Sequence, residues 1–115
     1  MPEETQETVT SARAALAATA ARVAAADRLL VETVRDAHRM AVESRERLAA
    51  IRAEIDAAVA RRSVATPAAG ADFARFLLAK NREIAEIVAE ARADAESKAV
   101  ALQELATEYR SAAAP

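Results

Sequence analysis

The sequence predicts an all-α protein: a long antiparallel hairpin of two helices, completed as a four-helix bundle by dimerisation. Three observations support this fold class: an alanine-rich and charged composition, a single glycine, and aliphatic residues at helical spacing. Hydrophobic residues make up 53% of the chain, charged residues 30% and aromatic residues 3%, a mixture typical of long helices and coiled coils. Strand formers are sparse, and the 115 residues suffice for one domain, residues 1–115.

The first helix is expected over residues 3–63, a stretch that contains neither glycine nor proline. Its apolar residues follow steps of three, four and seven, which place them on one face of a helix. That face comprises Val9, Ala12, Leu16, Val23, Ala26, Leu30, Val34, Ala37, Ala41, Leu48, Ile51, Ile55 and Ala58.

The second helix is expected over residues 67–112, where a similar apolar face recurs. It should end near Ala112, because the last residues, "SAAAP", offer nothing to pack. The face comprises Phe73, Leu77, Ile84, Val88, Ala91, Ala95, Leu102, Leu105 and Tyr109.

The turn between the helices is expected over residues 64–66. Thr66 can cap the second helix with its hydroxyl, and Pro67 suits the first helical position because its missing N–H would be unpaired there. An alternative start has Asp72 as the N-cap, with Gly70 in the loop. Gly70 is consistent with a close approach at the bend.

A turn centred near residue 65 also predicts the register of the hairpin. Because the first helix is longer, residues 3–16 should lack a partner within the chain. The expected neighbours are Ile55 with Phe76, Ala41 with Val88 or Glu90, Leu30 with Leu102, and Val23 with Tyr109.

A two-helix domain buries little surface, so a second chain is expected to cover part of it. Leu29, Val31, Val42, Leu78 and Ile87 fall outside the two stripes and suggest a second apolar face. The aromatic and aliphatic cluster beside the turn offers more apolar area than one hairpin end needs. The partner-binding hypothesis therefore comprises Phe73, Phe76, Leu77, Leu78, Leu29 and Val31, and the turn residues are Thr66, Pro67 and Gly70.

No residue pattern predicts catalysis, a cofactor or a metal site. His38 is the only histidine and is expected in the seam or on the surface. Glu83, Glu86 and Glu90 share a helix face but lack the Glu-x-x-His pattern of di-iron bundles. An Asp94–Lys98 pair is read as an exposed ion pair, with a polar layer that fixes the register as the alternative.

Charge and hydropathy restrict the partners. The net charge is −2 with the two signs interspersed, so no basic stripe suits nucleic acid. No apolar window is long enough to insert into a membrane. The N-terminus lacks the pattern of a signal peptide, so we expect a cytoplasmic protein, or one exported through a partner. The expected partners are a second copy, giving a homodimer, or another helical protein.

The stretch "TPAAGADFARFLLAKNREI" resembles a mycobacterial and related actinobacterial family of helical proteins catalogued as a domain of unknown function. The resemblance covers about a sixth of the chain and implies no established activity. The matching positions are Thr66, Pro67, Gly70, Phe73, Phe76, Leu77, Leu78, Ala79, Lys80, Arg82, Glu83 and Ile84.

A weaker resemblance is to the WxG-type helical hairpins exported by type VII secretion, which pair as four-helix bundles. Gly70 with Phe73 loosely echoes their turn, but the chain has no tryptophan. Tyr109 is followed by Ala113 where the export signal of those systems has an acidic residue. Together, the residues and resemblances predict a non-catalytic interaction module associated with type VII secretion or the cell envelope. The alternative is an intracellular coiled-coil scaffold with no export role.

Overall fold

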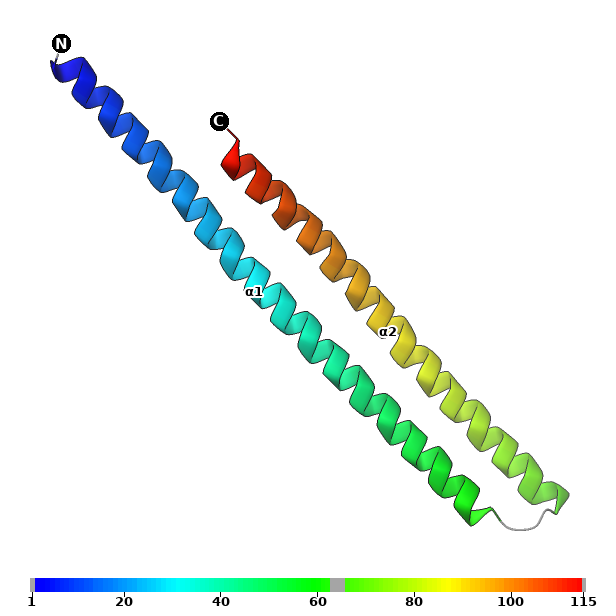
Figure 1. Cartoon of the computed structure of the whole chain (residues 1–115). Helices are drawn as coiled ribbons and strands as arrows, with labels where there is room; N and C mark the ends of the chain where they lie inside the picture. The colour runs from blue at the N-terminus through cyan, green and yellow to red at the C-terminus, as the bar shows by residue number, and fades with distance from the viewer. Residues whose placement is uncertain (1, 63–65, 115) are drawn as a thin grey trace. The chain divides into compact units, whose positions relative to one another are not determined.

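The computed structural model describes residues 2–62 and 66–114, which form two long helices that pack as a hairpin (Figure 1). Helix α1 spans Pro2–Arg61 and helix α2 spans Pro67–Ala113. The described residues contain no strand. The predicted all-helical hairpin is therefore confirmed.

The two helices divide into two compact units, each holding a segment of α1 and a segment of α2. The terminal unit comprises Met1–Arg35 and Lys98–Pro115. The central unit comprises Asp36–Ser97.

Helix α1 is continuous because its sequence contains no helix breaker after Pro2. Glu3 and Glu4 lie in its first turn and Arg61 in its last, where each sign complements the helix dipole. α1 ends at Arg61, near the expected boundary, and the backbone N–H of Arg62 donates to the carbonyl of Val59 over 3.2 Å. Residues 63–65, which include most of the expected turn, lie outside the described residues.

Helix α2 begins at Pro67, and its first turn is capped by Thr66. The Thr66 hydroxyl accepts a hydrogen bond from the N–H of Ala69 at 3.1 Å, and the Thr66 carbonyl accepts one from Gly70 at 3.0 Å. These bonds satisfy backbone donors that have no partner inside the helix. Asp72, the alternative cap, lies within α2 and pairs with Arg75 at 3.1 Å.

The expectation that Gly70 permits a close approach at the bend is wrong. Gly70 lies in the first turn of α2, and no described glycine has a positive φ. A Cβ atom built on Gly70 would meet nothing within 4 Å. Thr66 and Pro67 define the start of α2, so no special backbone freedom is needed at Gly70.

In the central unit, the contact between the helices is a seam of residues three and four apart, the spacing of coiled coils. Ile51 and Ile87 are buried at its centre, with 6% and 2% of their surfaces exposed. Half-buried neighbours continue the seam: Leu48, Ile55 and Ala58 on α1, and Phe76, Lys80, Ile84 and Ala91 on α2.

The terminal unit has the same kind of seam, built from smaller side chains. Ala26, Leu105 and Ala112 are buried, and Val23, Leu30, Thr33, Lys98, Ala101 and Glu108 are half-buried. On α1, every residue from Pro2 to Ala18 is exposed. This exposure agrees with the expectation that the first helix is longer than the second.

Contacts between the helices can be compared with the predicted register. In the terminal unit, Arg22 bonds Glu108, beside the expected neighbours Val23 and Tyr109, while Tyr109 itself bonds Asp27, one turn further along α1. In the central unit, Arg47 bonds Glu90, whereas Ala41 was the expected neighbour, and Arg62 is level with Phe73. The prediction is therefore close in the terminal unit and displaced in the central unit.

Candidate interaction surfaces

One edge of the central unit carries ion pairs between the helices. Arg47 of α1 pairs with Glu90 of α2 at 2.6 Å. Lys80 of α2 pairs with Glu54 of α1 and with Glu83 of its own helix. The hydrogen bonds that Lys80 donates, first to Glu54 and then to Glu83, raise the pKa of Lys80 above its ordinary value. This charged edge therefore fixes the two helices against each other.

The charged residues lie on one flank of the seam on each helix. Arg47 and Glu54 are seven residues apart and flank Ile51, while Glu83 and Glu90 have the same spacing and flank Ile87. Because Arg47 bonds Glu90 and Glu54 bonds Lys80, both flanks face the same edge.

The opposite edge of the central unit is apolar. Leu77, Ile84 and Val88 are seven and four residues apart and lie on the other flank of Ile87. On α1 the corresponding flank of Ile51 carries Val59. Leu77 is 37% exposed, Val88 36% and Val59 54%. We call Val59, Leu77 and Val88 the apolar edge, since part of each apolar side chain remains exposed there.

The two phenylalanines lie beside the apolar edge and are half-buried. The ring centroids of Phe73 and Phe76 are 6.3 Å apart with 24° between their planes. The Arg62 guanidinium lies 4.8 Å from the centre of the Phe73 ring, and Lys80 Nζ lies 5.5 Å from that of Phe76. Both rings thus already contact a cation of this chain, an arrangement that stabilises the hairpin end.

The remaining partner-binding residues do not form one face. Leu78 is 58% exposed, but it lies nine residues before Ile87, two and a half turns, so it points away from the seam. Leu29 and Val31 belong to the terminal unit and, two residues apart, point to different sides of α1. The structure therefore brings together Phe73, Phe76 and Leu77 of the predicted set.

The predicted second apolar face also contained an error. Ile87 was expected to lie outside the contact between the helices, yet it is 2% exposed and sits in the seam. Val42, from the same set, is half-buried. The aliphatic residues of α2 form two adjacent stripes, and α1 packs on the one that contains Ile87.

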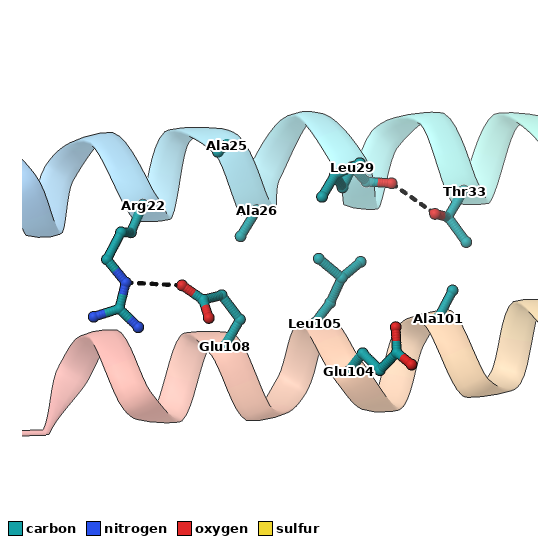
Figure 2. Close-up of a pocket in the computed structure, with 9 residues that line it drawn as sticks. All are labelled: Arg22, Ala25, Ala26, Leu29, Thr33, Ala101, Glu104, Leu105 and Glu108. Atoms are coloured by element: carbon teal, nitrogen blue, oxygen red, sulfur yellow. Dashed lines mark hydrogen bonds and ion pairs between the residues drawn. The ribbon is translucent and has the colours of Figure 1, made fainter.

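A groove in the terminal unit was not predicted from the sequence. It has a volume of about 470 Å³, and Figure 2 shows its mostly apolar floor between α1 and α2. Its lining comprises Arg22, Ala25, Ala26, Leu29, Thr33, Ala101, Glu104, Leu105 and Glu108. Alanines line much of it, so the groove arises where small side chains fail to fill the space beside the seam.

Polar contacts hold the helices together around this groove. Arg22 Nε donates to Glu108 at 2.9 Å (Figure 2). Nη2 of Arg22 donates to Ser111 at 3.1 Å, and the bond to Glu108 raises the pKa of Arg22. On the other side of the seam, the Tyr109 hydroxyl donates to Asp27. That hydrogen bond, aided by partial burial, raises the pKa of Tyr109.

The residues weighed for chemistry are not assembled into a site. His38 is exposed, and Glu83 and Glu90 are occupied by Lys80 and Arg47. Across residues 2–62 and 66–114, no three acidic or histidine side chains gather to hold a metal ion. Asp94 and Lys98 are half-buried. Within the same ranges, neither helix holds an apolar stretch that could cross a membrane.

A family model described as "Domain of unknown function (DUF4226)" matches residues 2–114. The relatives come from Mycobacterium tuberculosis. "Uncharacterized protein Rv0026" of strain H37Rv is 43% identical over 91 residues, covering 78% of this chain. "Uncharacterized protein MT0028" of strain CDC 1551 is 41% identical over 90 residues, covering 76% of this chain and 75% of the relative.

The relatives differ in length. The chain spans 20% of the length of Rv0026 and 32% of that of "Uncharacterized protein Rv0739", to which it is 38% identical over 87 residues. No solved structure matches the chain. The names of these relatives assign no activity.

Proposed function

This chain belongs to the DUF4226 family, and we propose that it is a non-catalytic helical module that binds a second helical chain. The main observation behind the proposal is that the two edges of the central unit differ in chemistry. One edge is tied by ion pairs between the helices, and the opposite edge exposes Val59, Leu77 and Val88. A hairpin with one apolar edge can bury it against another helix.

The side-chain chemistry gives no competing assignment among the described residues. The groove in the terminal unit is lined mainly by alanine and leucine, and its Arg22 and Glu108 neutralise each other. The strongest pKa shifts belong to Arg22, Lys80 and Tyr109, and each arises from a bond that joins α1 to α2. These shifts reflect contacts that hold α1 and α2 together.

Adjacent leucines of α2 provide a matched test. Leu77 lies on the apolar edge and Leu78 points away from the seam, and both are exposed enough to accept glutamate without loss of the fold. We expect Leu77→Glu to weaken association at least about tenfold, because a carboxylate would be buried in an apolar contact. Leu78→Glu should leave association unchanged.

Sedimentation equilibrium measures the mass of each variant, and circular dichroism confirms its helicity. If the purified chain does not self-associate, the Leu77→Glu and Leu78→Glu variants are compared in a pull-down from its source cells. The amount of helical partner protein that each variant retains is then measured. If the Leu77→Glu and Leu78→Glu variants show the same mass and retain the same amount of partner, the apolar edge is not a binding surface.

The cellular setting we propose is the cell envelope, through association with type VII secretion. It rests on the weak sequence resemblance of Gly70 and Phe73 to the WxG turn and on relatives from a mycobacterium. The alternative is an intracellular scaffold that binds its partner through the same edge. Fractionation of culture filtrate, envelope and cytosol separates the two, since recovery from the cytosol alone would favour the scaffold.

A further inference from the structure

The terminal and central units bury different side chains between their helix segments. In the terminal unit the buried residues are Ala26, Leu105 and Ala112, so two of the three contribute only a methyl group. In the central unit they are Ile51 and Ile87, which both have branched aliphatic side chains. Because hydrophobic stabilisation is roughly proportional to the apolar area removed from water, the central contact is the stronger of the two.

The half-buried side chains show the same difference. In the terminal unit the large apolar side chains of this class are Val23, Leu30 and the ring of Tyr109. The central unit holds more of them, among which are Met40, Val42, Leu48, Ile55, Phe73, Phe76 and Ile84. The terminal seam therefore has less apolar packing to keep its two helix segments together.

The space left unfilled beside the seam is larger in the terminal unit. The groove between α1 and α2 in Figure 2 has a volume of about 470 Å³, whereas a groove beside Ile51 and Ile87 has a volume of about 320 Å³. Ala25, Ala26 and Ala101 line the larger groove. Side chains that border open space lack packing partners on that side, which weakens the attraction across the seam.

Polar contacts do not compensate for this difference. The Arg22–Glu108 pair of the terminal unit joins side chains that are 45% and 43% exposed, and ion pairs of such exposure contribute little net stability. The central unit has a similarly exposed pair, Arg47 with Glu90, and in addition the bond of Lys80 to Glu54. Lys80 is only 15% exposed, so water competes less for this contact.

The seam positions at the boundary of the units are polar. On α2, Asp94 and Lys98 are half-buried and continue the spacing of three and four along the helix from Ile87 towards Leu105. On α1, the half-buried Thr33 donates its hydroxyl hydrogen to the Leu29 carbonyl over 2.7 Å, so its one donor is used within its own helix. Polar residues at seam positions lower the stability of a coiled coil, so packing is interrupted along both helices here.

We propose that the terminal unit opens on its own: its segments of α1 and α2 separate while the central unit stays packed. Proteins open in cooperative units, and those with few buried apolar contacts open at the lowest free energy. Opening exposes the seam residues Val23, Ala26, Leu30 and Leu105, so the open and closed hairpins present different apolar surfaces. This inference goes beyond the proposed function, because the apolar edge belongs to the central unit.

Amide hydrogen exchange of the full chain, followed by NMR at one protein concentration, tests the proposal. A helix segment that loses its packing is marginal in water, so its amides exchange when the unit opens. After correction for the intrinsic rates, the amides of Ala26 and Leu105 should exchange at least about tenfold faster than those of Ile51 and Ile87. Their rates should also rise less steeply with denaturant, because partial opening exposes less surface than global unfolding.

A pair of conservative variants tests whether the terminal unit opens independently. Ile87→Val weakens the central contact, so it should speed exchange at Ile51 several-fold and leave exchange at Ala26 unchanged, because partial opening keeps the central contact. Leu105→Val is the matched change in the terminal unit. It should speed exchange at both Ala26 and Ile51, because partial opening and global unfolding both disrupt the contact of Leu105.

Three results would overturn the proposal. They are equal exchange rates in the two units, slower exchange in the terminal unit, and an equal acceleration of Ala26 and Ile51 by Ile87→Val, which indicates a single cooperative unit. These exchange measurements and the masses of the Leu77→Glu and Leu78→Glu variants report on different units of the chain. Failure of this inference therefore leaves the proposed function in place.

Discussion

At the scale of single residues, Gly70 is the position where a simple change should improve the protein. It has helical backbone geometry, and an added methyl group would meet no neighbour. Gly70→Ala should therefore raise the free energy of unfolding by about 0.5–1 kcal/mol, mainly by restricting the unfolded chain. Thermal or denaturant unfolding at fixed protein concentration measures the change.

A matched control for Gly70→Ala lies one residue further along the same turn. Ala71 is exposed and helical, so Ala71→Gly should lower the free energy of unfolding by a similar amount. A destabilising Gly70→Ala would indicate that another chain approaches this backbone closely in the assembled state.

Lys80 illustrates how one residue can serve several contacts. Its ammonium group lies over the Phe76 ring and bonds both Glu54 and Glu83, with 15% of its side chain exposed. The sequence placed Lys80 in a motif but gave no sign of this role, because Glu54 comes from the other helix. Such a partner becomes apparent only when the register is known.

At the scale of the helices, alkaline pH should loosen the contact between α1 and α2. The pKa values of Tyr109 and Lys80 are raised by their carboxylate partners Asp27 and Glu54. Both groups therefore favour the folded state below their ordinary values of about 10, and this contribution is lost as the pH rises through the raised values. The free energy of unfolding should fall in that range.

Tyr109→Phe separates the contribution of Tyr109 to this decline from that of Lys80. The variant lacks the hydroxyl that bonds Asp27, so it should be less stable near neutral pH and lose less stability at alkaline pH. Denaturant midpoints of both proteins at about pH 8 and about pH 11 test this difference. An identical decline in both proteins would show that the Tyr109–Asp27 hydrogen bond does not contribute to the loss of stability at alkaline pH.

The sequence predicts the helices well and their contact less well. Thr66 and Pro67 mark the start of α2 because capping is a local interaction. The side of α2 that faces α1 is not local: Val88 continues the predicted stripe, but Ile87 occupies the seam. Two apolar stripes one residue apart suit a helix equally, so the packing of the other helix decides between them.

At the scale of the whole molecule, the candidate surfaces depend on which apolar stripe of α2 packs against α1 and which stays exposed. In the central unit, two exposed residues of the predicted α2 stripe, Leu77 and Val88, form the apolar edge together with Val59. The exposed start of α1 was predictable, because the first helical pattern is longer than the second. The groove was not, since it depends on where alanines of two distant segments meet.

The central claim is that this hairpin completes its packing with another helical chain, and a second copy is the first partner to test. The mass of the purified chain, measured by sedimentation equilibrium over a concentration series, tests it most directly. We predict a concentration-dependent rise from the 12.2 kDa of one chain to twice that mass. A mass that stays at 12.2 kDa throughout the series would contradict self-association through the apolar edge.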